Sequence, residues 1–222
     1  MAEERRAGRG YAIVLLLVVA SFVFAATAPD APWSRGVFLL ISIATLVVTL
    51  WVSHAGPWSY IAVAAVLVAT ALASAEIAQG GNGLAGAAGI ASAAFVLWTI
   101  VEIARGVAGA GTVNRQSVLG AVAIYLLLGI LFMFIYSVVA LLGSGPFFAQ
   151  GTSGTPALRL YFSFITLTTV GYGDYTAASS LGHTLSIIEA LLGQLYLVTV
   201  VAVLVSRLGS QQRTAVPPDA DG

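Results

Sequence analysis

Residues 166–174 read TLTTVGYGD, and this polar stretch lies between two long apolar runs of a chain that is 59% hydrophobic. A dehydrated cation needs several oxygen ligands, and main-chain carbonyls can provide them where consecutive carbonyls point the same way. An ordinary strand alternates its carbonyls, so that geometry requires unusual backbone dihedrals, which glycine adopts most readily. Gly171 and Gly173 come at alternate positions. We therefore expect this stretch to coordinate cations through its backbone.

The element before this stretch must carry it to the middle of a membrane. Thr155 can cap a helix and Pro156 suits its first position. A helix over 156–168 would be about 20 Å long, too short for a hydrocarbon core of about 30 Å. It would enter from outside, stop midway and return as non-helical backbone, which is tolerated at that depth only where protein buries it or it lines a water-filled cavity. One chain supplies one wall of such a pore, so a closed ring predicts symmetric copies, most simply a homotetramer.

The composition predicts lipid as the main solvent. Only 8% of the residues are charged and the mean hydropathy is +0.98, whereas a soluble domain carries about 25% charged residues. A net charge of zero provides no global field that would attract nucleic acid. The chain has no cysteine and two histidines, and it shows no convergent acid, base and nucleophile. We therefore expect neither an enzyme nor a bound cofactor.

Six apolar segments could each cross the bilayer, which predicts an all-α membrane protein with a re-entrant pore helix and filter between the fifth and sixth transmembrane helices. Glycine, proline, asparagine or charged residues mark the boundaries of these segments. The predicted spans are about 11–28, 36–52, 58–78, 84–104, 118–142 and 181–207. The arginines before the first segment also fit a signal peptide, but the five segments that follow favour a retained span.

Arginine positions predict the orientation of the chain. With six spans both termini share one side, and most arginines fall on that side: Arg5, Arg6, Arg9, Arg105, Arg115, Arg207 and Arg213. Only Arg35 and Arg159 fall on the other side. The positive-inside rule therefore predicts a multi-pass protein of the plasma (cell inner) membrane with both termini in the cytoplasm.

These boundaries divide the chain into a cytoplasmic N-terminus, a four-helix membrane domain, a cytoplasmic linker, a pore domain and a disordered cytoplasmic tail. Their predicted ranges are 1–10, 11–105, 106–117, 118–208 and 209–222. The pore domain contains an outer helix, a pore helix, a filter and an inner helix. These are predicted over 118–142, 156–168, 168–174 and 181–207.

The segment TTVGYGD, 168–174, resembles the selectivity-filter signature of potassium channels. It stands in the order of that family (span, short pore helix, filter, span), and the resemblance covers about residues 118–208. The resemblance implies passive conduction of K+, which would be the permeant ligand of four backbone carbonyls and one threonine hydroxyl. The carbonyls are those of Thr169, Val170, Gly171 and Tyr172, and the hydroxyl is that of Thr169.

The resemblance also implies residues that support the filter. The Tyr172 ring would brace the filter from behind, and Asp174 would lie at the outer mouth, tied to the pore helix. The supporting residues are Thr168, Gly173, Asp174, Tyr161 and Phe162. Many family members have two tryptophans where this chain has the last two of these, and Phe162 cannot donate a hydrogen bond, so we expect a weaker cuff around the filter. Some bacterial channels have a pore-helix glutamate where this chain has Ile165.

The inner helix carries the candidate gate and cavity residues. Counting on from Asp174, Gly193 falls where the family has its hinge glycine, although glycine also serves close packing of membrane helices. By the same count Gln194 faces the cavity below the filter. The pore-facing stripe continues with Leu197, Val201 and Val205, an apolar ring that could close by dewetting.

Glu189 is an ionisable residue inside the predicted inner helix, and such a residue marks a functional-site hypothesis. It could brace helix packing as a protonated or partnered acid. It could instead hydrogen-bond the pore helix behind the filter, or make the channel sensitive to pH. The sequence leaves these alternatives open.

The first four spans match the voltage-gated superfamily in number only. That superfamily has a fourth helix with Arg or Lys at every third position, whereas segment 84–104 contains no basic residue. We therefore expect weak or no voltage dependence. Gly86 and Gly89 in that segment indicate close helix packing, and Glu102 with Arg105 indicates a surface ion pair.

Two other functions compete with a conducting potassium channel. A potassium uptake transporter resembles such channels but carries four pore repeats in one chain, whereas this chain has one. A regulatory or sensory membrane protein with a silent pore would use the first four spans, and the intact filter disfavours it. The expected partners are three further copies of the chain, membrane lipids and, for opening, an unidentified activator.

Overall fold

The computed structural model describes residues 2–27, 83–109 and 115–214, with isolated helical positions between residues 37 and 51. The described ranges form five α-helices, four long and one short, and no strand, apart from an isolated bridge between Phe148 and Ala177. The helices are α1 (Ala2–Thr27), α4 (Gly83–Gly109), α5 (Arg115–Leu142), α6 (Pro156–Leu167) and α7 (Ser180–Thr214). This confirms the all-α prediction for the part of the chain that the structure describes.

Three of these helices contain stretches that are long and apolar enough to cross a membrane: Gly89–Ala108, Gln116–Leu142 and Ser180–Val200. They correspond to the fourth, fifth and sixth predicted spans. The first predicted span falls on the shorter apolar helix Tyr11–Thr27. The second falls partly on the isolated helical positions, and the third, 58–78, lies outside the described residues.

α1 begins at Ala2, so the helix includes residues 2–10 of the predicted cytoplasmic N-terminus 1–10, whose location stays a prediction. One predicted boundary is corrected. α7 continues to Thr214, beyond the predicted end at residue 207 and into the predicted disordered tail 209–222. The reason is local, because this end is rich in arginine, leucine and glutamine, which favour helix, and the first proline comes only at Pro217. Residues 215–222 lie outside the described ranges.

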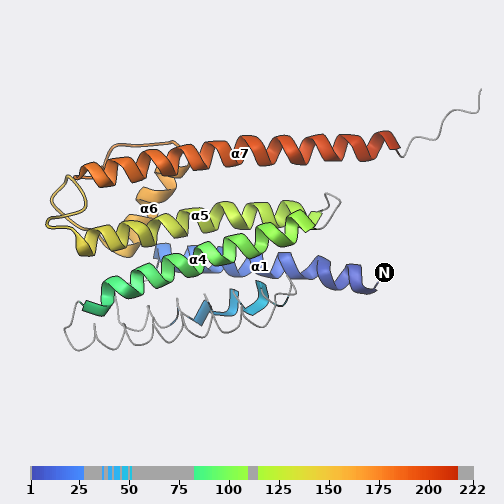
Figure 1. Cartoon of the computed structure of the whole chain (residues 1–222), viewed down its shortest axis with the longest axis horizontal. Coiled ribbons are helices and arrows are strands. Elements are labelled where there is room, and N and C mark those ends of the chain that lie inside the picture. The colour runs from blue at the N-terminus through green and yellow to red at the C-terminus, as the bar shows by residue number, and fades with distance from the viewer. Residues whose placement is uncertain are drawn as a thin grey trace, which may run out of the picture.

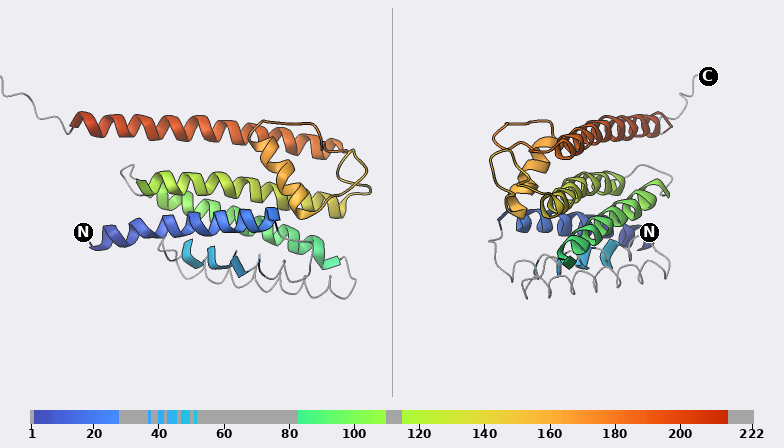
Figure 2. Two further views of the ribbon diagram at one scale, coloured as in Figure 1. Left: turned by 180° about the vertical axis from the view of Figure 1, so that it is seen from behind. Right: turned by 60° about the vertical axis from the view of Figure 1, so that its left-hand side comes forward.

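The helices form a bundle in which α5 is central (Figure 1). α1 and α4 lie against α5, while α6 crosses the space between α5 and α7 near one end of the bundle, as both views of Figure 2 show. The start of α1, the end of α4, the start of α5 and the end of α7 lie at the opposite end. The described chain ends therefore share one side, as an even number of spans requires.

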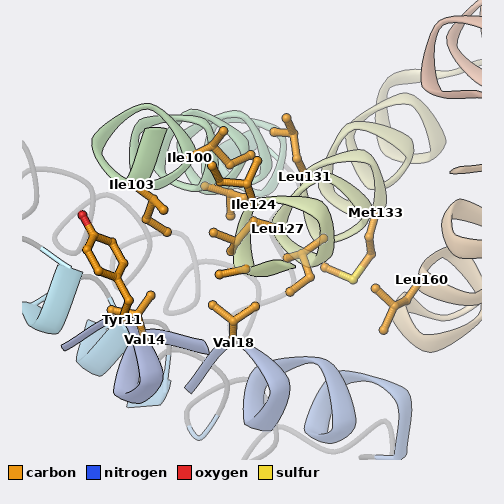
Figure 3. Packing of buried hydrophobic residues seen from close by; sticks show 13 residues of the cluster. Tyr11, Val14, Val18, Ile100, Ile103, Ile124, Leu127, Leu131, Met133 and Leu160 are labelled. Carbon is orange, nitrogen blue, oxygen red and sulfur yellow. The ribbon is translucent and has the colours of Figure 1, made fainter. Parts of the chain in front are cut away.

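The main hydrophobic core, the first core, joins the N-terminal helices to the pore helices (Figure 3). It contains apolar residues of α1, α4 and α5 and one residue of α6. They are Tyr11, Val14, Val18, Val96, Ile100, Ile103, Ala123, Ile124, Leu127, Ile130, Leu131, Met133 and Leu160. The predicted four-helix domain and pore domain thus share one core, in which α1 and α4 contact the α5 of their own chain.

Small residues allow this close packing of α4 on α5. A Cβ atom added at Gly89 would lie 2.7 Å from Cγ2 of Val138, and one added at Gly86 would lie 3.2 Å from Cδ2 of Leu142. Real side chains do not approach so closely without a shift, so these two glycines set the helix separation. The predicted packing role of both is confirmed.

The predicted ion pair on α4 is present but is not wholly at the surface. Nη1 of Arg105 lies 3.1 Å from Oε1 of Glu102, and the two side chains are 67% and 9% exposed, respectively. The correction follows from the helix geometry, because a residue three positions before an exposed one can face a neighbouring helix. Glu102 is therefore a nearly buried acid that forms an ion pair with an exposed arginine.

Candidate functional site

The short helix α6 begins and ends as the sequence predicts. Oγ1 of Thr155 accepts a hydrogen bond from the backbone N–H of Leu158 at 3.1 Å, and Pro156 occupies the first turn. The helix ends at Leu167, one residue before the predicted end, with Thr168 as its C-cap. Twelve residues make a helix of about 18 Å, which is shorter than a bilayer core of about 30 Å.

The backbone after α6 alternates in hand. Thr169, Gly171 and Gly173 have φ values of 58°, 51° and 77°, which are left-handed, at every second position. A left-handed conformation is uncommon for threonine and was not predicted at Thr169, whereas glycine was expected at both other positions. Such alternation lets consecutive peptide groups face one side instead of alternating as in a strand.

Two backbone hydrogen bonds tie this stretch to α6. The N–H of Thr169 donates to the carbonyl of Thr166 at 2.9 Å, and the N–H of Gly171 donates to the carbonyl of Ile165 at 3.0 Å. These bonds hold the returning backbone against the C-terminal end of the helix. The stretch 168–174 therefore follows α6 directly and is hydrogen-bonded to its last turn, while its role as a filter stays a prediction.

The filter stretch is open on its other side. Val170 is 52% exposed and Tyr172 is 72% exposed. A Cβ atom added at Gly171 or Gly173 would meet nothing within 4 Å. In this chain, then, the described residues leave the Tyr172 ring exposed, and its bracing role stays a prediction.

Asp174 is tied to the pore helix as expected. The hydroxyl of Tyr161 donates a hydrogen bond to Oδ2 of Asp174 at 2.7 Å. This bond to the carboxylate raises the pKa of the Tyr161 phenol to about 12. The phenol therefore keeps its proton, and its role as donor, at any physiological pH.

Phe162 lies in an aromatic cluster behind the filter, the second core. Its ring centroid is 5.2 Å from that of Tyr136, 5.4 Å from that of Phe148 and 6.0 Å from that of Phe147. Such packing stabilises through burial and edge-to-face contacts without a hydrogen bond from Phe162. The roles of Phe147 and Phe148 were not predicted. Two adjacent phenylalanines in a polar, glycine-rich loop are nevertheless a pattern that indicates burial against the helices.

Arg159 anchors the start of α6, a role that the sequence did not reveal. Its Nε donates to Oγ of Ser137 on α5 at 2.8 Å, and its Nη1 donates to the carbonyls of Ser153 and Gly154, both at 2.7 Å. One side chain thus joins the outer helix, the loop and the pore helix. Spacing along the chain could not predict these partners, because Ser137 is 22 positions away.

The inner-helix residues lie close to the filter. Nε2 of Gln194 donates to Oγ1 of Thr169 at 3.2 Å. A Cβ atom added at Gly193 would collide with the backbone carbonyl of Leu167, so this glycine permits close contact between α7 and the end of α6. α7 is continuous through Gly193, and the hinge stays a prediction.

The lower gate residues are only partly described. The Leu197 side chain is 44% exposed. Val201 and Val205 belong to α7, but their side chains lie outside the described residues. Their predicted role as an apolar ring therefore stays a prediction.

Glu189 is fully buried, with 0% exposure, where α5, α6 and α7 meet. The hydroxyl of Tyr136 lies 2.5 Å from its Oε2, and the hydroxyl of Ser163 contacts its Oε1. The structure confirms that Glu189 hydrogen-bonds the pore helix behind the filter, which also braces the three helices. Its effect on gating stays a prediction.

The comparisons with known proteins concern this part of the chain. Residues 124–210 match the family model described as an ion channel. This segment is similar to ion channels. It runs from the first half of α5 to near the end of α7 and so includes α6 and the filter stretch. With the apolar helices, the match supports a membrane protein that conducts ions passively rather than an enzyme. No significant match was found among curated proteins or among solved structures.

Proposed function

We propose that the chain is a potassium-selective channel that conducts K+ passively through a homotetrameric pore. The observation that carries this proposal is the left-handed backbone at Thr169, Gly171 and Gly173, within TTVGYGD, at the end of a helix too short to cross the membrane. The match of residues 124–210 to ion channels supports the coarser function of ion conduction.

The proposed mechanism replaces water around K+ by backbone oxygens. Four copies of the stretch would surround one axis, and the carbonyls of 169–172 with the Thr169 hydroxyl would form stacked ion sites. Gln194 donates to one lone pair of the Thr169 hydroxyl oxygen, which leaves the second lone pair for the ion and the hydroxyl proton free to turn away from it. The C-terminal end of α6 would direct its negative dipole toward the cavity below.

The proposed assembly would turn the filter carbonyls toward the fourfold axis and the exposed filter side chains away from it. Val170 and Tyr172, both exposed in one chain, would then contact neighbouring copies. With arginines concentrated at the end of the bundle that carries the chain ends, that end would face the cytoplasm of the plasma (cell inner) membrane. We expect little voltage dependence, because segment 84–104 carries no basic residue.

The test is ion flux from purified protein in liposomes, with K+ or Na+ as the permeant ion. Gly171→Asp should abolish flux, since residue 171 has a φ of 51° and would carry a charge into the filter. Gly151→Asp is the matched control, because Gly151 has a φ of 79° and equally open surroundings but lies in the outer loop. Equal flux of both ions would contradict potassium selectivity, and no flux in any condition from a folded tetramer would favour a silent pore.

A further inference from the structure

The carboxyl group of Glu189 lies in a closed set of hydrogen-bonding groups. The three side chains that meet there, Glu189, Ser163 and Tyr136, are each 0% exposed and come from three different helices. Both oxygens of Glu189 face hydroxyl groups, Ser163 at Oε1 and Tyr136 at Oε2. The positions of the protons in this set follow from counting donors and acceptors.

Ser163 has one proton and two neighbours. Its Oγ lies 2.8 Å from the carbonyl oxygen of Gly129 on α5 and also contacts Oε1 of Glu189. A backbone carbonyl can only accept, and an ionised carboxylate can only accept. With an ionised Glu189, one of these two contacts would therefore bring two acceptors together without a proton between them.

A protonated Glu189 removes this conflict. Its Oε1–H donates to Ser163, which is then free to donate to Gly129. On the other oxygen, Tyr136 has one proton to give, and its second neighbour, Oγ of Ser186, lies 3.5 Å away. With the acid proton on Oε1, Oε2 can only accept, and it lies 2.5 Å from the Tyr136 hydroxyl, so Tyr136 donates to Oε2, while Ser186 donates to the carbonyl of Gly182 at 2.9 Å. Every proton then has one acceptor.

The surroundings of the carboxyl group favour the neutral form. A buried charge is costly unless it is paired, and more so in the interior of a membrane protein. The cation on α6, Arg159, directs its donors to Ser137 and to two loop carbonyls. Tyr125 is a further titratable group near this site, and its buried hydroxyl has no hydrogen-bond partner among the described residues.

We propose that Glu189 is held as a neutral carboxylic acid that donates its proton to Ser163, and that this proton positions the pore helix. The donor chain runs from Tyr136 to Glu189, Ser163 and the Gly129 carbonyl, and so links α5, α7 and α6. Ser163 stands near the middle of α6, whose C-terminal end begins the filter. One turn along α7, Gly193 lies against that same end. The link to ion conduction rests on the proposed function, whereas the proton assignment does not.

Infrared spectroscopy of the detergent-solubilised full chain at neutral pH tests the assignment. The expected result is a protonated-carboxyl C=O band that disappears in Glu189→Gln and persists in Glu102→Gln, the control, because Glu102 forms an ion pair with Arg105. Ser163→Ala should shift this band, since the acid loses its acceptor. Absence of the band, or a band that Glu189→Gln leaves unchanged, would overturn the proposal.

A second measurement tests the positioning role. An amide at 189 can donate to Ser163 and accept from Tyr136, so Glu189→Gln should keep the unfolding temperature and the K+ over Na+ flux ratio, while Glu189→Ala should lower both. Loss of stability in Glu189→Gln equal to that in Glu189→Ala would contradict a neutral acid. Because the infrared and unfolding data need no ion flux, a protein that does not conduct would refute the proposed function and leave the proton assignment to be decided by these data.

Discussion

Two helices of the proposed pore, α5 and α7, are both long and apolar enough to cross a membrane, but their surroundings are opposite. In its membrane-spanning window, 56% of α5 is buried within the chain, compared with 11% of α7. Among the described helices, α5 contacts α1, α4, α6 and α7, whereas α7 contacts α5 and α6 alone. The described residues therefore bury much of α5 within one chain and leave most of α7 exposed.

The exposed part of α7 consists of large apolar side chains on several faces of the helix. They include Leu181, Ile187, Ile188, Leu191, Leu192, Leu195, Leu197 and Val198. The filter residues Val170 and Tyr172 are exposed as well. In the proposed tetramer these surfaces are the ones that neighbouring copies and lipid would cover.

The largest expected effect on unfolding comes from replacing one leucine by alanine, first in α5 and then, as a comparison, in α7. Leu127→Ala on α5 removes a side chain that is 5% exposed, and we expect a loss of about 2–5 kcal/mol in the free energy of unfolding. Leu195→Ala on α7 removes one that is 60% exposed and should leave the unfolding of the single chain nearly unchanged. Denaturant unfolding in detergent measures both, and equal losses would contradict the comparison.

The second prediction concerns assembly. Polar replacement of two exposed leucines one turn apart, Leu191→Asn with Leu195→Asn, should weaken the proposed tetramer while helix content stays the same, because these side chains are 57% and 60% exposed in the single chain. Native mass spectrometry measures the oligomeric state, and circular dichroism measures the helix content. An unchanged tetramer would assign this face of α7 to lipid.

The third prediction concerns the contact between α1 and the pore helix. The rings of Phe22 and Phe164 meet edge to face with centroids 4.7 Å apart, and a Cβ atom added at Gly129 would overlap the Phe164 ring. Phe22→Ala should therefore cost about 1–2 kcal/mol of unfolding free energy. Val23→Ala, at a neighbouring position that is 51% exposed, is the control. If both variants unfold alike, α1 does not support the pore helix.

The smallest expected effect is at the outer mouth. Tyr161→Phe removes the hydrogen-bond donor to Asp174 and should leave folding unchanged. At low K+ concentration, K+ flux from liposomes should decline faster than in the unmodified protein, because the outer end of the filter is then less firmly held. Tyr175→Phe serves as the matched control, because the Tyr175 ring packs on Phe148, with centroids 5.3 Å apart, and this contact survives. Stable flux in Tyr161→Phe would show that the filter does not depend on this bond.

Helix ends, caps and left-handed glycines could be predicted from the sequence alone. The bounds of α6 to within one residue, the capping by Thr155 and the left-handed Gly171 and Gly173 were all predictable. The reason is that caps, prolines and backbone hand depend on a few neighbouring residues. The apolar helices were predictable for a similar reason, since span length and composition are properties of one segment.

Contacts between residues far apart in the sequence depend on the tertiary structure. Glu189 meets Ser163 and Tyr136 across 26 and 53 positions of sequence, respectively, and Arg159 finds Ser137 on another helix. Only tertiary packing also brought α1 into the same core as the pore helix. A helix pattern shows which residues share a face but not which helix that face will contact, because apolar surfaces of similar shape are interchangeable until packing and hydrogen-bond partners select one arrangement.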